Sequence, residues 1–477
     1  MNIIKKIWNS PTLMTWGNLI SSSLKLILLT PLILTRYNED YIAFWYLLLT
    51  INSLAIVLDF GFYPTFSRII SYAFNGLDSI KDITLIKNSK KDEGKPNWSF
   101  LEKIYGTVNT IYFSLTFLVG ILVFVFSFSP IYNIIDRVLD KSTLETAYFV
   151  FILSIVLNFL SKKFDSVLIG TNHVALINRW NIINNVLNTF TSICIVLIGL
   201  NVEWLAFNQL FFSVFLFFRN YFLERFICNE KFKEFKLFSF DKDIFKWVWN
   251  PVWQSGILIF ASTGLTQATG LIYSTLSDSS QLVSYLLTLK LVTIASQFSQ
   301  APFYSKIPVF SGLRVKGKIK ELSTVTQESI FKSLIVYVFL ISLVFLFGDY
   351  ALQIIGSKSK LENSNFIILM AFVWFFERHH AMHAQIFVTT NKVPFYKTAI
   401  ISGLINLILI YLLLPSLSTW AFPVSYGVSN AVINNWWNVK LSLNSLNENK
   451  VKYFYKSAAI PLIILLLLAT LNFLIKN

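Results

Sequence analysis

Thirteen long apolar segments run through the 477-residue sequence, and they restrict the fold more than any other feature. A helix that crosses a membrane needs about 20 mainly apolar residues. Only 14% of the residues are charged, whereas soluble domains carry about 25%. The sequence therefore predicts an all-α polytopic membrane protein. The expected spans are 12–34, 41–60, 104–128, 145–162, 182–200, 203–221, 250–274, 280–301, 330–347, 363–388, 397–414, 418–438 and 457–475.

The basic residues indicate how the chain is oriented. With the N-terminus in the cytoplasm, 32 of the 40 Lys and Arg residues fall in the N-terminal tail, the cytoplasmic loops or the adjoining parts of the spans. This is the positive-inside distribution of membrane proteins. The net charge of +15 is therefore mostly a topology signal, and we do not expect nucleic acid as a partner.

Two short sequences occur twice at matching places. Residues 58–68 (LDFGFYPTFSR) resemble 296–306 (SQFSQAPFYSK), and GTNHV at 170–174 resembles TTNKV at 389–393. Six spans per copy is an even number, so both copies insert in the same orientation, as in many transporters. The predicted parts are a six-helix lobe 1–221, a cytoplasmic linker 222–249, a second six-helix lobe 250–440, and a loop with an additional span at 441–477.

The stretch LDFGFYPTFSRIIS closes the second span and places an acid at the end of an apolar run. An ionised Asp in hydrocarbon is costly, so it is usually buried in protein and often functional. Asp59 with Gly61 and Pro64 predicts a bend that lines a cavity. In the alternative interpretation, Asp59 makes a structural pair with Arg68 or with another cation.

Two lysines lie inside spans rather than at their ends. Asn18, Ser22 and Lys25 have the i, i+4, i+7 spacing of one helix face. Lys25 either lines a cavity or extends its ammonium to the nearer interface. Lys290 lies in the middle of the eighth span, with Gln297 two turns further on, which favours a cavity.

The tenth span carries FFERHHAMH, which holds three of the four histidines of the chain. One interpretation is a structural Glu–Arg pair with hydrogen-bonded histidines. Another is a cavity site for anion contact or proton coupling, because His titrates near physiological pH. A metal site is the least favoured, since no other ligand set is evident. These candidate gating or coupling residues are Glu377, Arg378, His379, His380 and His383.

The fourth span, which corresponds to the tenth, ends in Lys162, Lys163 and Asp165. These residues either line the same cytoplasmic vestibule or lie at the lipid interface. The sequence contains no P-loop, dinucleotide-binding fingerprint or nucleophile elbow, and no long loop with paired carboxylates. We therefore expect a transporter that does not use ATP, rather than an enzyme.

The repeat, the D-F-G, Pro and S-R pattern at 59–68 and the TNHVAL turn after the fourth span resemble the polysaccharide repeat-unit (O-antigen, Wzx-type) flippases. Their superfamily also includes the multidrug/toxin extruders and the lipid II flippase. The resemblance implies alternating access by two lobes and a cationic lining that holds a lipid-linked pyrophosphate. Lys25 and Lys290 would provide that lining together with Asn18 and Gln297. Arg68 and the tenth-span cluster would form the cytoplasmic entrance.

The resemblance also implies the biological setting. The substrate would be an undecaprenyl-pyrophosphate-linked oligosaccharide, moved across the bacterial inner membrane in contact with membrane lipids. A polysaccharide polymerase and a chain-length regulator would be partners. No cofactor is expected, and a proton or cation would be the coupling ion. Two alternatives stay open, a multidrug antiporter of the same fold and a membrane enzyme of glycan assembly.

Overall fold

The structure is a computed structural model that describes residues 8–74, 96–228, 230–304, 306–315, 317–390 and 394–476. The described residues form helices and connecting turns, with no β-strand among them. The chain divides into two compact units, Met1–Ser279 and Ser280–Asn477. The prediction of an all-α polytopic membrane protein is confirmed.

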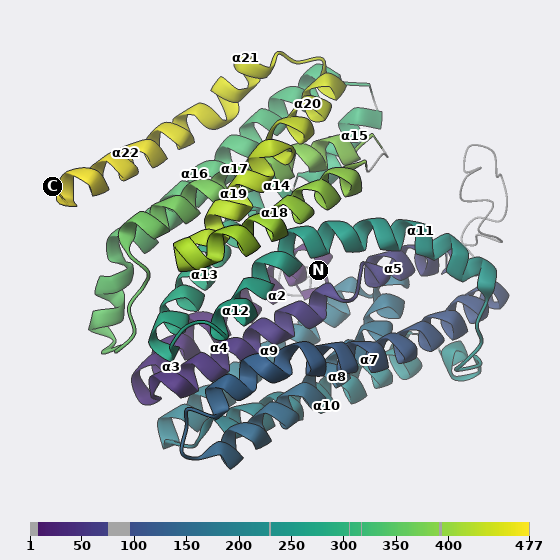
Figure 1. The fold of residues 1–477 in the computed structure, drawn as a ribbon. Helices are drawn as coiled ribbons and strands as arrows, with labels where there is room; N and C mark the ends of the chain where they lie inside the picture. Colours follow the sequence, from purple (N-terminus) through teal and green to yellow (C-terminus); the bar gives the residue numbers. More distant parts are fainter. Residues whose placement is uncertain are drawn as a thin grey trace. The chain divides into compact units, whose positions relative to one another are not determined.

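The first unit contains the N-terminal helices and also the first helices of the second half of the sequence, up to Ser274 (Figure 1). Three of its segments are π-helical: η1, η2 and η4. Its helices are α2 (Pro11–Leu24), η1 (Lys25–Leu29), α3 (Thr30–Arg36), α4 (Glu39–Val57), α5 (Phe62–Phe74), α7 (Trp98–Ile135), α8 (Lys141–Gly170), α9 (Val174–Ile198), α10 (Val202–Phe222), η2 (Leu223–Cys228), η3 (Glu230–Lys233), α11 (Lys242–Ile259), η4 (Phe260–Gly264) and α12 (Leu265–Ser274).

The second unit contains the remaining helices. It ends with a helix that follows the two predicted six-helix halves. Its helices are α13 (Ser279–Ser299), α14 (Ala301–Tyr304), α15 (Ile307–Val315), α16 (Ile319–Ile354), α17 (Ser364–Val388), α18 (Phe395–Leu417), η5 (Ser418–Trp420), α19 (Ala421–Val432), α20 (Asn434–Leu446), α21 (Lys450–Phe454), η6 (Tyr455–Ala459) and α22 (Ile460–Lys476).

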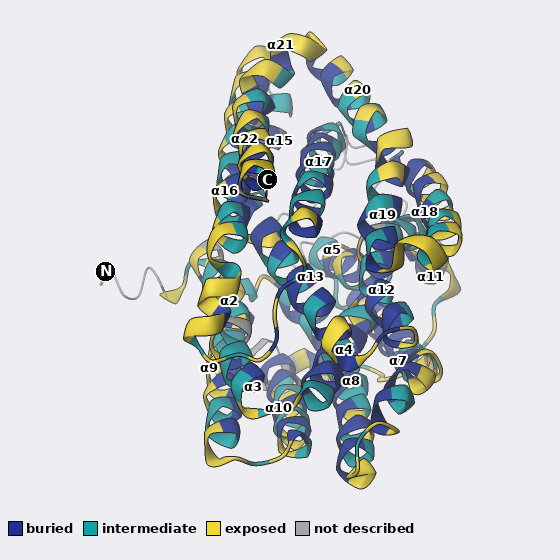
Figure 2. Cartoon of the chain, turned by 60° about the vertical axis from the view of Figure 1, so that its left-hand side comes forward, coloured by how far each residue is buried: buried dark blue, intermediate teal, exposed yellow. Residues whose placement is uncertain are grey.

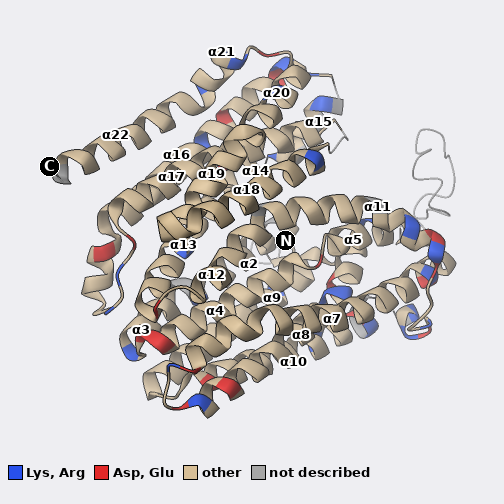
Figure 3. Cartoon of the chain, in the orientation of Figure 1, with Lys and Arg blue, Asp and Glu red and all other residues tan. Residues whose placement is uncertain are grey.

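Nine helical stretches within the described residues are long and apolar enough to cross a membrane. In each unit many of the charged residues lie near the helix ends (Figure 3). Exceptions within the helices include Lys162 of α8, Lys290 of α13, and Glu377 and Arg378 of α17. This distribution follows from the cost of placing charge in hydrocarbon. It supports a multi-pass membrane protein.

The predicted internal repeat has a counterpart in the order of the helices. The first helix of each half is interrupted by a π-helical segment, η1 in one and η4 in the other. The second helix of each half is interrupted after about four to six turns, between α4 and α5 and between α13 and α14. A very long helix then follows, with 38 residues in α7 and 36 in α16.

The break between α4 and α5 lies at Asp59, Phe60 and Gly61, so the predicted bend is present. Phe60 has φ 51° and Gly61 has φ 85°. A bulky residue at positive φ is an outlier that only surrounding structure can hold in place. The Phe60 ring supplies this support, because it packs directly on the backbone of Gly256 in α11. The bend therefore packs against α11, which lies at the start of the seventh expected span.

The packing of α11 to α12 places the start of the second half within the first unit. α11 contacts α5 and α7, and α12 contacts α4 and α7. The compact units therefore divide at Ser279, whereas the expected lobes divide at the linker 222–249. The lobes 1–221 and 250–440 stay a prediction about which parts move together.

The C-terminal segment contains the additional helix that the sequence predicts. α22 and η6 pack on α16, and α22 also contacts α17. Much of α22 is exposed (Figure 2), and its exposed residues include the apolar Ile460, Ile463, Leu467 and Leu474. In a membrane protein such a surface faces lipid, so α22 is a peripheral helix of the second unit.

We predict that Gly256→Ala destabilises the protein, although alanine is the better helix former. A Cβ at this position would meet Cδ1, Cγ and Cβ of Phe60, and the unusual backbone of Phe60 leaves it little room to move. Overpacking of this kind costs about 1–3 kcal/mol. Thermal unfolding of the purified protein in detergent, followed by intrinsic fluorescence, measures the change.

Gly17→Ala is the matched control for this prediction. A Cβ there meets only the terminal methyl of Ile182 at 2.7 Å, with the next atom at 3.6 Å, and this flexible end can turn away. Gly17→Ala should leave the unfolding temperature unchanged or raise it. Equal unfolding temperatures for the two variants would show that the bend is not held by α11.

Candidate functional site

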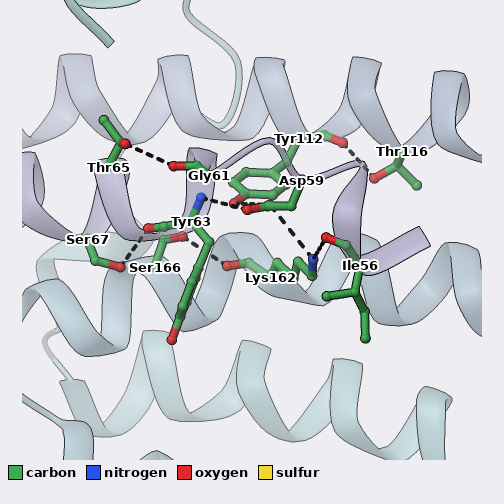
Figure 4. Close-up of polar contacts among 10 residues, drawn as sticks. All are labelled: Ile56, Asp59, Gly61, Tyr63, Thr65, Ser67, Tyr112, Thr116, Lys162 and Ser166. Carbon is green, nitrogen blue, oxygen red and sulfur yellow. Dashed lines mark hydrogen bonds and ion pairs between the residues drawn. The ribbon is translucent and has the colours of Figure 1, made fainter. Parts of the chain in front are cut away.

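Asp59 lies at the centre of a polar cluster at the bend (Figure 4). Its Oδ2 accepts the backbone N–H of Tyr63 at 3.1 Å, and its Oδ1 accepts the hydroxyl of Tyr112 at 3.0 Å. The Nζ of Lys162 approaches the same Oδ1 to 3.9 Å. Only 6% of Asp59 is exposed. The cluster therefore joins the bend to α7 and α8.

The structure decides which cation pairs with Asp59. The partner is Lys162 of α8, and Arg68, which is exposed on α5, makes no salt bridge with Asp59. Lys162 also donates to the carbonyl of Ile56 at 3.5 Å, and its Nζ lies 4.9 Å from the centre of the Phe159 ring. Lys163 lies instead over the ring of Phe164 at 4.7 Å. The two neighbouring lysines thus have different surroundings.

Lys25 is held by neutral oxygens in the π-helical segment η1. Its Nζ donates to Oδ1 of Asn188 at 3.0 Å and to Oε1 of Gln209 at 3.1 Å, and lies 6.0 Å from the Trp45 ring centre. No salt bridge joins it to a carboxylate in the described part of the chain. Because an ammonium has three donors, one N–H is left for a ligand.

Four asparagines spaced three or four residues apart form a stripe along α9, which packs against α2: Asn178, Asn181, Asn185 and Asn188. Asn18 donates to Oδ1 of Asn178 at 3.1 Å and accepts the side-chain amide of Asn185 at 3.2 Å. Asn178 in turn donates to Thr15 at 3.0 Å. Asn18 and Lys25 therefore belong to one polar seam between α2, α9 and α10. In this structure the amides of the stripe join the helices together.

A second charged network in the first unit was not predicted from the sequence. The guanidinium of Arg219 donates to Oδ1 of Asn220 at 3.0 and 2.6 Å and to Oδ1 of Asn181 at 2.8 Å. Asn220 donates to Asp165 at 2.8 Å. Arg219 lies near the end of the expected span 203–221, and hydropathy does not show which side chains lie opposite it. The position of Asn181 within the α9 stripe was the signal that a polar partner lies opposite.

Glu224 is a further buried acid near the same end of the unit. It is 1% exposed and accepts the hydroxyl of Tyr105 at 3.1 Å. It lies in the π-helical segment η2, which begins the segment predicted as the linker. The start of that linker is therefore anchored on α7.

In the second unit, Lys290 of α13 is half-buried. No hydrogen bond or ion pair joins its Nζ to any residue that the structure describes. Gln297, two turns further on, is exposed. Lys290 thus resembles Lys25 in lacking a carboxylate partner. The substrate-binding roles assigned to Lys25, Lys290, Arg68, Asn18 and Gln297 stay predictions.

The charged cluster of α17 contains one closed ion pair. The guanidinium of Arg378 donates two hydrogen bonds to the carboxylate of its neighbour Glu377, from Nε and from Nη2. His380 shares a hydrogen bond of 3.2 Å with Asn438 of α20. His379 and His383 are buried on the same helix. Across the described ranges, no group of three or more His, Cys, Asp or Glu is arranged to hold a metal ion.

Comparison with solved structures identifies the fold. The MATE multidrug transporter DinF-BH is 12% identical, with a TM-score of 0.61 over 94% of this chain and 97% of that one. The lipid II flippase MurJ in an inward closed conformation is 14% identical, with a TM-score of 0.59 over 97% and 99%. A mutant of the Vibrio cholerae MATE transporter VcmN is 14% identical, with a TM-score of 0.55 over 94% and 99%.

No protein-family model matches the chain, and a search of curated proteins finds no match. The structural neighbours include MATE transporters of the MOP superfamily and a lipid II flippase. The chain therefore has the fold of that superfamily. At 10–14% identity the likeness concerns the fold alone.

We predict that Asp59→Ala destabilises the protein more than Lys162→Met does. Removing the carboxylate leaves the N–H of Tyr63 unpaired and takes one partner from the buried hydroxyl of Tyr112, at a cost of about 3 kcal/mol. Lys162→Met removes only a long, partly exposed ion pair, which is worth about 0–1 kcal/mol. Thermal unfolding of the purified proteins measures both changes.

Arg68→Met serves as the control, because Arg68 is exposed and its loss should not alter the unfolding temperature. If Asp59→Ala were as stable as the unchanged protein, the polar cluster would not hold the bend. If Arg68→Met and Asp59→Ala were equally harmful, the assignment of Lys162 as the partner would be wrong.

Proposed function

We propose that this protein is a flippase for undecaprenyl-pyrophosphate-linked oligosaccharide repeat units, such as those of O-antigen or another surface polysaccharide. It would work by alternating access in the bacterial inner membrane, with its N-terminus in the cytoplasm. One observation carries the proposal: Lys25 and Lys290 lack acidic partners, whereas the buried acids Asp59 and Glu377 are in ion pairs.

The buried carboxylates are occupied by groups of the protein itself. Asp59 has Tyr112 and Lys162, Glu224 has Tyr105, and Glu377 has Arg378. An extruder of cationic drugs requires acids that are free to bind cations. Asp59 and Glu377 do not offer that, because Lys162 and Arg378 neutralise them, so their balance with Lys25 and Lys290 favours an anionic substrate.

The two lysines supply one cation from each half of the sequence. An ammonium that is held by neutral amide oxygens keeps its full positive charge for a ligand, unlike an ammonium in a salt bridge. Charge-assisted hydrogen bonds to phosphate oxygens are among the stronger polar contacts in proteins. Lys25 and Lys290 would thus bind the pyrophosphate while the lipid tail stays in the membrane.

The remaining partners belong to the same proposal. Membrane lipids would surround the exposed apolar helix faces, and a polysaccharide polymerase and a chain-length regulator would take over the flipped repeat units. Asp59 with Lys162 would hold the bend during the cycle. Arg68, Lys163 and the α17 cluster would contact the substrate at its cytoplasmic entrance or couple an ion.

A multidrug antiporter is the second candidate, because MATE multidrug transporters are among the structural neighbours. Deletion of the gene separates the two functions. A flippase mutant should accumulate lipid-linked repeat units that face the cytoplasm and should lose surface glycan. An antiporter mutant should instead retain fluorescent cationic dyes and keep its surface glycan, and that result would overturn the flippase proposal.

We predict that Lys25→Ala and Lys290→Ala each reduce flipping roughly tenfold or more, since each change removes one charge-assisted contact. Lys→Arg at either position should do less harm because it keeps the charge. Surface glycan in a complemented deletion strain measures the effect, and immunoblots of membranes verify that each variant is present. Full glycan levels in both Ala variants would rule out this pyrophosphate site.

We also predict that the membrane potential drives flipping. A pyrophosphate diester carries about two negative charges, and the interior of the cell is electrically negative. Moving two charges outward gains roughly 4–5 kcal/mol at 100 mV. In proteoliposomes with a fluorescent lipid-linked sugar, a potassium diffusion potential at equal pH should bias flipping in one direction. A bias that appears only with a pH gradient would replace this mechanism with proton antiport.

A further inference from the structure

Three buried histidines of α17 carry ring nitrogens that no described residue satisfies. His379, His380 and His383 are 5%, 8% and 1% exposed. The unsatisfied atoms are Nε2 of His379, Nε2 of His380 and both ring nitrogens of His383. Buried polar atoms without a partner are costly and need an explanation. The cluster lies entirely within the second unit.

Two of these histidines form a pair. His379 and His383 are four residues apart, on one face of α17, and their ring centres are 4.7 Å apart. An imidazole that gains a proton becomes a donor at both nitrogens, whereas a neutral imidazole keeps one acceptor. At this ring separation, a small reorientation lets one ring donate to the other. His380 differs, because its Nδ1 already has Asn438.

The C-terminal segment covers this pair with two aromatic rings. Phe454 lies 5.6 Å from the His379 ring, and Tyr453 lies 5.4 Å from the His383 ring. Tyr453 is held in place by a 2.8 Å hydrogen bond from its hydroxyl to Thr326 of α16. An aromatic face attracts a cation, and more strongly where water is excluded. The cover is therefore suited to a charged imidazole.

The other charged and titratable groups around the pair are accounted for. Glu377 and Arg378 neutralise each other on α17. Glu448, next to α21, accepts the hydroxyl of Ser323 at 2.7 Å. On α16, Glu321 pairs with Lys318, Glu328 pairs with Lys332, and Asp349 accepts the N–H of Leu361. The other charged groups on α16, α20 and α21 are the lysines Lys320, Lys440, Lys450 and Lys452, and the nearby phenols are Tyr304, Tyr337, Tyr426 and Tyr453. No unpaired carboxylate faces the pair from these described elements.

We propose that His379 and His383 form a binding site for a single proton, with Tyr453 and Phe454 as its cover. The proton comes from water and adds to a free ring nitrogen of one imidazole, which becomes an imidazolium. That ring then donates an N–H to the second, neutral imidazole. A second proton is excluded, because two imidazolium ions at this distance repel each other in a buried environment.

The site gives the additional C-terminal helix a function. Because its two aromatic rings cover the histidine pair, movement of α21 away from α17 opens the pair to water, and its return closes the pair. Proton exchange then depends on the position of the C-terminal segment. Use of this proton as the coupling ion rests on the proposed function, whereas proton binding itself does not.

The test is a pH titration of the full-length protein in nanodiscs, with ¹³C,¹⁵N-labelled histidine and detection by NMR. The chain has only four histidines, so each signal can be assigned with one His→Gln variant. The fourth, His173, lies between α8 and α9, and burial lowers the pKa of this residue. Its separate titration serves as the internal reference.

We expect the signals of His379 and His383 to change together as the pH falls, with one shared midpoint and an uptake of one proton per chain. His379→Gln should remove the change at His383 over the same pH range, and His380→Gln should leave the pair unaltered. Tyr453→Ala with Phe454→Ala should speed proton exchange at the pair, while Tyr455→Ala, on the exposed neighbour, should not.

The spectrum of the unchanged protein decides the proposal even if a variant fails to fold. Separate midpoints for His379 and His383, uptake of two protons, or neutral signals throughout the range in which His173 titrates would each overturn it. Shifts that appear only on addition of Zn²⁺ would also overturn it, in favour of a metal ligand. None of these results bears on lipid-linked sugar transport, so failure here is distinct from failure of the proposed function.

Discussion

The cost of placing a charge in hydrocarbon is the constraint on which the rest of this structure depends. Each ionised group inside the helical region needs a partner within the protein, or it must be reserved for a ligand. Asp59 meets this requirement through Tyr112, Tyr63 and Lys162, and Glu377 meets it through Arg378. Through its partners Asp59 also links the bend to two long helices. Local charge pairing and the path of the backbone are thus set by the same contacts.

The contrast between paired acids and unpaired lysines is the main link from structure to function. Lys25 is kept in place by amide oxygens that balance none of its charge, and Lys290 has no described partner. Fold similarity cannot separate a flippase from a drug transporter, because both occur among the structural neighbours. Our proposal of an anionic substrate rests instead on the charge distribution.

The sequence predicted the fold class, the bend at Asp59 and the additional C-terminal helix, because these follow from long apolar runs and helix breakers. It did not identify Lys162 as the partner of Asp59, since that contact joins residues more than 100 positions apart. It did not identify the contact of Arg219 with Asn181, because hydropathy does not show which side chains of two helices lie opposite each other. The π-helical segments η1 and η4 have no recognised sequence signal, and they became visible only in the structure.

The packing of the bend against α11 has a consequence for biosynthesis. The first six expected spans leave the ribosome before α11 exists, yet the Phe60 ring rests on Gly256. Until α11 and α12 are made, α4, α5 and α7 lack the helices that pack on them in the finished first unit. Until then, the surfaces of α4, α5 and α7 that later contact α11 and α12 are not covered by these helices. Completion of the first unit is tied to synthesis of the second half, which makes the two repeats interdependent during assembly.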